Sequence, residues 1–266
     1  MSAANAVDGA SAGEPGDDGV RGRSPRSGSM SAGSLTKRVD ALDWPTICGG
    51  LDDLGVTSIG ELLSKDECHD AIAMYDNERF RSTINMGQKR FGEGEYRYFA
   101  NPLPPFVAEL RAAFWPHLLP VAREWAERRG QPAPWPDRFV DWIRMCHDAG
   151  QRRPTPLMLR YGPGDWNALH RDLYGELVFP LQVVIGLNEP DDDYIGGEFV
   201  MVEQRLRAQS RPTTNVIRRG HGLVFTTRDR PIRTARGWAG APMRHGVSVV
   251  RSGQRHTLGM VFHDAE

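Results

Sequence analysis

After Pro154 the spacing of the apolar residues changes from the period of a helix to the period of a strand. Leu157, Leu159 and Tyr161 stand at every second position, and residues 179–187 repeat this alternation. Successive side chains of a strand point to opposite faces, so alternation of this kind predicts strands with one buried face. Further short runs of the same type follow at Glu198–Val202, Gly222–Thr226, Gly246–Val250 and Thr257–Phe262. Short strands separated by turn signals predict a β-sandwich or jelly roll over residues 154–266.

The residues before Pro154 follow helical spacing instead. The longest apolar stripe predicts a helix from near Pro105 to Arg129, kinked or split by its internal prolines, Pro116 and Pro120. A helical half that precedes a set of strands implies that the helices pack against the sheets.

Three regions are therefore expected. Residues 1–34 are rich in Gly, Ser, Ala and Asp, with hardly a large apolar residue, and are expected to form a disordered tail. Residues 35–153 are expected to form a helical support region, and residues 154–266 the β core, the two together making one structural domain.

The chain is expected to be cytoplasmic. No apolar run approaches the ~18–20 residues that cross a bilayer, and the N-terminus lacks the apolar segment of a secretory signal. Its cysteines, Cys48, Cys68 and Cys146, are widely spaced and form no CxxC pair, which argues against a disulfide framework and a zinc site.

Positive charge is concentrated near the C-terminus. Between Met201 and Met260 the chain has twelve arginines and two acidic residues, Glu203 and Asp229, a local net charge of +10. Such a segment is either a solvated strand surface or a face that attracts a polyanion such as nucleic acid.

His170 and Asp172 form the only His-x-Asp sequence in the chain. In an extended segment, residues two apart point the same way, so an imidazole and a carboxylate can bind one metal ion. Two histidines and one carboxylate that leave coordination positions open suit a non-haem Fe(II) oxygenase. The second histidine has to come from a distant strand.

Four histidines compete for this position, namely His221, His245, His256 and His263. If the cosubstrate is 2-oxoglutarate, its far carboxylate needs a fixed cation, best an arginine. A histidine that begins one strand and a cation on the next are naturally about ten residues apart. Only His245 has such a cation, Arg255, at that distance.

Several motifs in order resemble the prolyl-4-hydroxylase-like branch of the 2-oxoglutarate/Fe(II) oxygenases. The resemblance covers about 105 residues, from Leu157 to Phe262, and its motifs are Leu159–Trp166, His170–Asp172, Gly196–Phe199, Arg219–Phe225 and His245–Leu258.

This resemblance implies a double-stranded β-helix, the cupin-like jelly roll, with a helical buttress. It also implies Fe(II), 2-oxoglutarate and O2 as cofactor and cosubstrates. His170, Asp172 and His245 would be the metal ligands and catalytic residues, and Arg255 would bind the C5 carboxylate, where the family often has lysine. Tyr161 and Thr257 would add hydroxyl contacts to 2-oxoglutarate.

The region Phe91–Phe99, taken together with the C-terminal half, resembles a bacterial group predicted to demethylate alkylated bases in nucleic acid. A base removed from its stack needs an aromatic pocket and cations for the flanking phosphates. Trp166, Tyr174 and Trp238 are candidates for the aromatic contacts, and the C-terminal arginines for the phosphates.

Other functions remain open. The spacing between His245 and Arg255 matches hydroxylases of protein side chains, such as prolyl, and of small molecules. A non-enzymatic cupin-like binding module would need the metal ligands but not Arg255. The span between Asp172 and His245 is long, and its arginine-rich parts, 205–219 and 228–241, are expected to form loops over the opening of the barrel.

Overall fold

The computed structural model describes residues 34–77, 79–172, 175–205 and 208–266. Over these residues the helices are α1 (Ser34–Asp40), α2 (Trp44–Leu54), α3 (Lys65–Asn77), α4 (Met86–Lys89), α5 (Pro105–Arg128) and α6 (Phe139–Asp148). The strands are β1 (Val56–Glu61), β2 (Phe80–Asn85), β3 (Gly92–Glu93), β4 (Glu95–Phe99), β5 (Leu157–Tyr161), β6 (Trp166–His170), β7 (Leu181–Gly186), β8 (Tyr194–Gly196), β9 (Phe199–Glu203), β10 (Arg211–Asn215), β11 (His221–Thr226), β12 (Asp229–Thr234), β13 (Gly237–Val247), β14 (Val250–Gly253) and β15 (Arg255–Val261). The tail predicted for residues 1–34 lies, apart from Ser34, outside the described residues.

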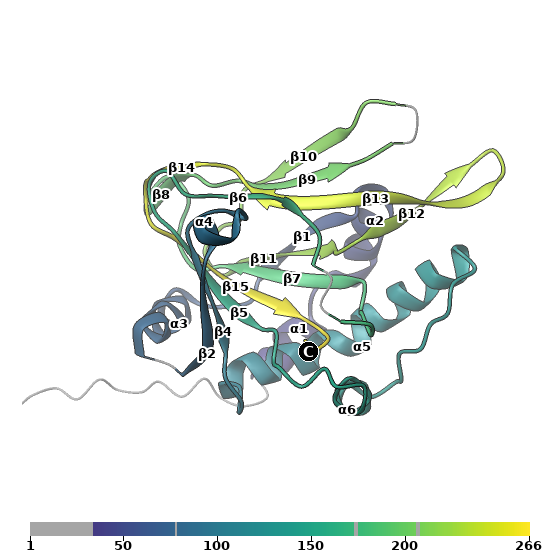
Figure 1. Cartoon of the computed structure of the whole chain (residues 1–266), viewed down its shortest axis with the longest axis horizontal. Coiled ribbons are helices and arrows are strands. Elements are labelled where there is room, and N and C mark those ends of the chain that lie inside the picture. Colours follow the sequence, from purple (N-terminus) through teal and green to yellow (C-terminus); the bar gives the residue numbers. More distant parts are fainter. Residues whose placement is uncertain (1–33, 78, 173–174, 206–207) are drawn as a thin grey trace, which may run out of the picture.

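Two antiparallel sheets face each other (Figure 1). The larger sheet has the strand order β1-β11-β7-β15-β5-β4-β2, and the smaller has the order β10-β9-β13-β6-β3. From β5 onward the chain passes back and forth between them: β5, β7, β11 and β15 lie in the larger sheet, and β6, β9, β10 and β13 in the smaller. This alternation is the jelly-roll topology predicted for residues 154–266.

The N-terminal half contributes strands as well as helices, and the expectation of a helical region over residues 35–153 needs correction here. β1 pairs with β11, β4 pairs with β5, and β3 pairs with β6, so the early strands extend both sheets. The expected helix near Pro105 is present as α5, which is continuous through both internal prolines, so the predicted split is wrong.

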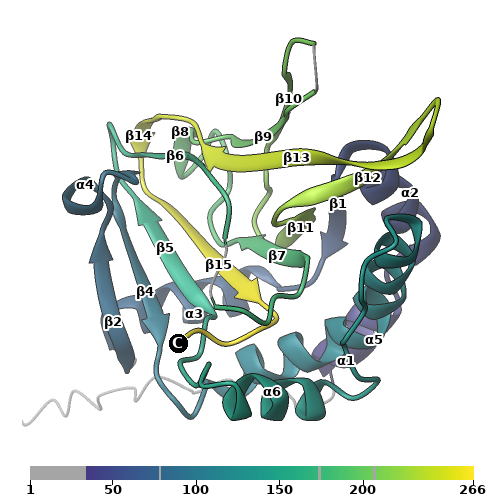
Figure 2. The same cartoon turned by 45° about the vertical axis from the view of Figure 1, so that its right-hand side comes forward.

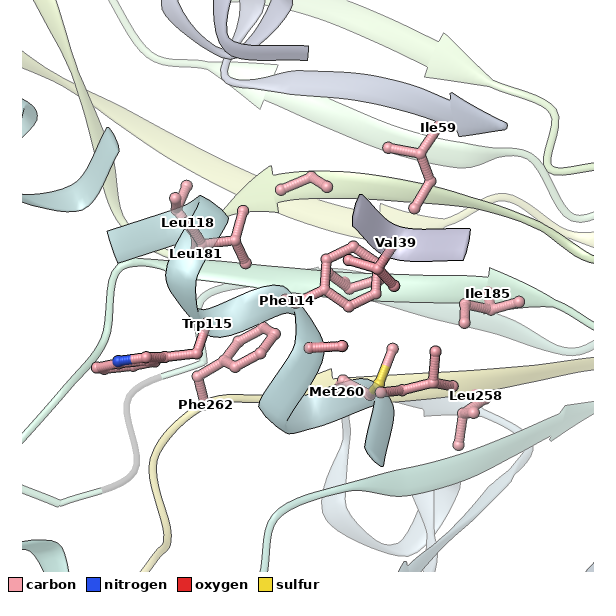
Figure 3. Packing of buried hydrophobic residues seen from close by; sticks show 14 of the residues in the cluster. Val39, Ile59, Phe114, Trp115, Leu118, Leu181, Ile185, Leu258, Met260 and Phe262 are labelled. Atoms are coloured by element: carbon pink, nitrogen blue, oxygen red, sulfur yellow. The ribbon is translucent and has the colours of Figure 1, made fainter. Parts of the chain in front are cut away.

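The helices α1, α5 and α6 lie along one side of the larger sheet (Figure 2). Figure 3 shows Phe114 and Leu118 of α5 against Leu181 of β7 and Met260 of β15, all of them fully buried. Because side chains alternate along a strand, this packing turns the other face of β15 toward the smaller sheet. The function of the chain depends on that inner face.

The two arginine-rich segments are mainly β-hairpins, which corrects the expectation of loops. β10 pairs with β9, and β12 pairs with β13, and both hairpins project from the body of the molecule (Figures 1 and 2). Among the described residues of 205–219 and 228–241, none lines the cavity between the sheets.

Candidate metal and cosubstrate site

The structure brings His170, Asp172 and His245 together between the two sheets. His170 ends β6, and His245 is its direct partner across the antiparallel pair of β6 and β13. Their ring centroids are 4.3 Å apart. Asp172 lies between the rings: its Oδ1 is 3.3 Å from Nε2 of His170, and its Oδ2 is 3.2 Å from Nε2 of His245. One ligand atom from each residue lies within 4.8 Å of the others, the spacing needed to hold one metal ion.

A backbone contact sets the orientation of His170. Its Nδ1 lies 2.7 Å from the carbonyl oxygen of Ala168, so Nδ1–H donates a hydrogen bond and Nε2 is left to face Asp172. Ligating histidines in metal sites are oriented in the same way by a partner of the second ring nitrogen.

The pKa shifts of Asp172 and His245 also suit a metal. Burial opposes ionisation of Asp172, but His245 and His170 outweigh it and hold the pKa of the carboxyl well below its usual range. Burial, with His170 beside it, lowers the pKa of His245. Burial also disfavours the charged form of His170, but the contact with Asp172 outweighs it and raises its pKa. An ionised carboxylate and a neutral imidazole are the forms that bind metal ions.

Arg255 begins β15 and lines the same cavity, which has a volume of about 350 Å³. Its side chain is 2% exposed, yet within the described part of the chain its Nε and Nη1 atoms have no hydrogen-bond partner. Buried N–H groups without an acceptor are costly. The carboxylate of a ligand would supply acceptors for them.

Tyr161 and Thr257 are both buried in the same cavity. The guanidinium carbon of Arg255 lies 5.5 Å from the ring of Tyr161, whose hydroxyl accepts a hydrogen bond from Asn167 Nδ2 at 3.4 Å. Burial raises the pKa of Tyr161 to about 12, although Arg255 opposes the shift. The phenol therefore stays protonated at neutral pH and can donate to an anion.

Of the aromatic residues predicted to contact substrate, the two that the structure describes, Trp166 and Trp238, do not line the cavity. Trp166 and Trp238 are each 40% exposed, and neither lines the cavity. Trp238 lies in β13 with Arg128 and Arg233 against its ring, at 4.9 and 5.4 Å. Tyr174 lies outside the described residues.

Other aromatic side chains line the cavity instead: Phe91, Tyr96, Phe199 and Phe225. The rings of Phe199 and Phe225 lie 5.8 and 4.8 Å from the ring of His245. A signal for two of them was present, because Phe91 and Tyr96 belong to the stretch that resembles the demethylase group. Alternation within the predicted strands could have indicated the other two.

The remaining histidines have other partners. Nδ1 of His221 lies 3.0 Å from the carbonyl of Arg219, and Nδ1 of His256 lies 3.0 Å from Oδ1 of Asn188. His263 accepts a hydrogen bond from the backbone N–H of Phe179 at 3.2 Å. The choice of His245 from its spacing to Arg255 agrees with this geometry.

Part of the predicted positive charge is neutralised within the fold. The buried carboxylate of Glu203 binds Arg205, Arg211 and Arg230, at 2.7, 3.0 and 2.6 Å. Asp229 similarly binds Arg129 and Arg171.

None of the helices within the described ranges is both long enough and apolar enough to cross a membrane.

Comparison with known proteins agrees with this site. Residues 94–265 match the model of the Oxygenase-NA family, described as "Oxygenase, catalysing oxidative methylation of damaged DNA". An uncharacterized protein of Mycobacterium tuberculosis, found in strains CDC 1551 / Oshkosh and H37Rv, is 60% identical over 167 residues, which are 63% of this chain and 72% of the relative.

Similar solved structures include an oxidoreductase of the 2OG-Fe(II) oxygenase family from Burkholderia pseudomallei, with 15% identity and a TM-score of 0.47, covering 84% of this chain and 92% of that one. A prolyl-4-hydroxylase from Pseudomonas putida has 11% identity and a TM-score of 0.48, over 84% and 99% of the two chains. The family match covers most of the chain and includes His170, Asp172, His245, Arg255, Tyr161 and Thr257. The chain belongs to the Oxygenase-NA family and is a 2-oxoglutarate-dependent iron oxygenase that uses Fe(II), 2-oxoglutarate and O2.

Proposed function

We propose that this oxygenase removes methyl groups from alkylated bases in DNA or RNA. The family description, which refers to damaged DNA, supports a nucleic-acid substrate. When bound, iron with 2-oxoglutarate and O2 supplies the oxidation of a C–H bond. One oxygen atom of O2 enters the N-methyl group, and the other enters succinate as CO2 leaves. The N-hydroxymethyl product then releases formaldehyde and leaves an N–H group on the base.

The observation that carries the proposal is that Nε and Nη1 of Arg255 lack hydrogen-bond partners in the cavity that also holds the three metal-binding side chains. In the proposed arrangement His170, Asp172 and His245 hold Fe(II), and Arg255 binds the C5 carboxylate of 2-oxoglutarate. Tyr161 and Thr257 lie close enough along the cavity to add hydroxyl contacts. The cosubstrate is then fixed at both ends before the second substrate arrives.

The lining of the cavity supports a planar substrate group. Its walls are mostly aromatic and aliphatic, which suits a base removed from its stack. Arg90 and Phe91, both exposed, lie at its rim. Arg90 suits a contact to a flanking phosphate, and Phe91 offers a surface on which a neighbouring base can stack.

A backbone hydrogen bond joins this rim to β6, the strand that ends at His170. Ala168 of β6 donates a hydrogen bond from its N–H to the carbonyl of Phe91 at 2.8 Å. A substrate that contacts Phe91 is therefore placed relative to the adjacent His170. We infer that this coupling aligns the methyl group with the metal.

The test is turnover of 2-oxoglutarate by the iron-loaded enzyme with four additions: a methylated single-stranded oligonucleotide, the same sequence unmethylated, a proline-rich peptide, and buffer. We expect the methylated oligonucleotide alone to stimulate succinate formation and to yield one formaldehyde per succinate. The Asp172→Ala variant, which lacks a metal ligand, is the matched control and should give neither product. Stimulation by the peptide and not by the oligonucleotide would replace this proposal with hydroxylation of a protein side chain.

A further inference from the structure

A second unpartnered polar group lies in the same cavity. Gln182 is on β7, its side chain is 4% exposed, and its Nε2 atom has no hydrogen-bond partner among the described residues. Its neighbours across the sheet are Phe225 on β11 and Val261 on β15, which have no polar side-chain atom. A buried amide without a partner destabilises the fold, so the position of this amide in the cavity favours a ligand-binding role.

The cavity has one other amide side chain, Asn167, and it differs in this respect. Asn167 already donates a hydrogen bond from Nδ2 to the hydroxyl of Tyr161. Among the described residues that line the cavity, Gln182 is thus the amide whose Nε2 atom remains available to a ligand.

The strand register separates Gln182 from Arg255. On β15, Thr257 lies opposite Gly186 and Val261 lies opposite Gln182. Arg255 therefore lies six residues along β15 from the level of Gln182, roughly 20 Å at the rise of a strand. The five-carbon chain of 2-oxoglutarate, with bonds of about 1.5 Å, spans only part of this separation. A cosubstrate bound to Arg255 therefore lies mainly on the Arg255 side of the cavity, away from the level of Gln182.

Gln182 and the metal-binding residues line the same cavity, and Phe225 links them. Phe225 is the direct partner of Gln182 across β7 and β11, and its ring lies 4.8 Å from the ring of His245. A substrate group that enters this part of the cavity can therefore reach both the Gln182 amide and the metal-binding residues.

We propose that the Gln182 amide hydrogen-bonds the polar edge of the base and so turns its methyl group toward His170, Asp172 and His245. This inference rests on the proposed demethylation of bases. An amide offers a donor and an acceptor side by side, the pattern that complements the edge of a nucleobase. Gln182 is then a specificity-determining residue that acts on the second substrate and not on 2-oxoglutarate.

The test compares Gln182→Met, which keeps the length of the side chain but has no amide, with Gln182→Glu and with the exposed control Gln254→Met. For Gln182→Met we expect the KM for the methylated oligonucleotide to rise about 10- to 100-fold, with the 2-oxoglutarate affinity unchanged. Gln182→Glu loses the N–H donor and should show a rise of similar size. The control should match the wild type.

Thermal unfolding of the same proteins gives a readout that does not depend on activity. Gln182→Met removes a buried unpartnered amide, so its Tm should rise above that of the wild type. If the variant bound substrate weakly because it misfolded, its Tm would instead be lower than that of the wild type. An unchanged KM in Gln182→Met would overturn the assignment. A parallel loss of 2-oxoglutarate affinity would also overturn it, because Gln182 would then act on the cosubstrate.

The two proposals fail in different ways. If no methylated oligonucleotide stimulates the wild-type enzyme, base demethylation fails and the assignment of Gln182 to a base edge fails with it. If the wild type is stimulated and Gln182→Met responds equally, only the assignment of Gln182 fails.

Discussion

A Cβ atom added at Gly197 would lie 2.8 Å from Cδ of Arg255, closer than real Cβ contacts allow. Gly197 also has a φ of +66°, a backbone conformation that favours glycine. Gly197 follows directly after β8. Because it has no side chain, it leaves room for the Arg255 side chain to extend into the cavity. The Gly-Gly pair in the sequence therefore has a physical role at the cosubstrate anchor.

Replacing this glycine should weaken cosubstrate binding. We expect Gly197→Ala to displace Arg255 and to lower the affinity for 2-oxoglutarate about 10-fold or more, measured by calorimetric titration of the iron-loaded protein without O2. The matched control is Gly130→Ala, where φ is +60° but nothing lies within 4 Å of an added Cβ. It carries the same backbone cost, about 1–2 kcal/mol, and should bind 2-oxoglutarate normally. Equal affinities in both variants would contradict the steric explanation.

Reversal of the anchor charge should separate cosubstrate binding from metal binding. In Arg255→Glu we expect at least about 100-fold weaker 2-oxoglutarate binding, since a charge-assisted pair worth about 1.5–3 kcal/mol is lost and repulsion replaces it. Fe(II) should still bind. Arg251→Glu, an exposed change on the neighbouring β14, is the control. Unchanged 2-oxoglutarate affinity in Arg255→Glu would show that the carboxylate binds elsewhere.

Metal binding should be visible as stability. A ligand that binds only the folded state stabilises it, by about 2.7 kcal/mol at a concentration 100 times its Kd. Fe(II) added without O2 should therefore raise the Tm of the wild type, and a chelator should reverse the shift. Asp172→Ala should abolish it, and Asp192→Ala, an exposed acidic control, should not. A full shift in Asp172→Ala would place the metal at other residues.

A buried ion pair joins helix α5 to the segment that follows β15. Arg111 of α5 contacts Asp264 at 2.8 Å and donates to the backbone carbonyl of Val261, and both charged side chains are 4% exposed. Removing one partner leaves a buried charge unpaired, so Arg111→Met should lower the free energy of unfolding by about 3–5 kcal/mol. Arg144→Met, which breaks an exposed pair with Asp141, should cost about 0–1 kcal/mol. Urea denaturation of both variants measures the difference.

Acid should destabilise the fold through a buried histidine. Burial lowers the pKa of His263 to about 4, from an ordinary value of 6.5. The unfolded chain therefore takes up this proton first, and stability falls as the pH drops from about 6.5 to about 4, by roughly 3 kcal/mol. His263→Gln should make this fall shallower, whereas His69→Gln, at an exposed position, should not. Urea denaturation between pH 7.5 and 4.5 tests this, and parallel curves for the wild type and His263→Gln would refute it.

The sequence was most informative where a local rule fixed the position of a side chain. His170 and Asp172 are two residues apart, so their mutual orientation follows from extended backbone geometry. The spacing of His245 and Arg255 identified the right pair, although His245 lies near the end of β13 and the short strand β14 stands between β13 and β15. The jelly roll of the C-terminal half was predictable from short apolar runs separated by turn signals, although β7 and β15 are buried at every position.

Contacts between residues far apart in the sequence could not be predicted by such local rules. β2 and β4 have little burial contrast between their two faces, so the strand pattern in the N-terminal half was weak. Trp166 and Trp238 were predicted to form aromatic contacts with the substrate, although they lie in β6 and β13 and do not line the cavity. Gln182 follows the general alternation of β7, but its orientation into a cavity depends on which face of the sheet the helices cover.

The early strands have a practical consequence for dividing the protein. A fragment that began at residue 154 would lose the partners of β11, β5 and β6 together. Each would then present an unpaired row of backbone donors and acceptors, which is how sheets recruit other chains into aggregates. The catalytic half defined by its motifs is thus not a unit that can be excised, and soluble expression requires the residues that close its edges.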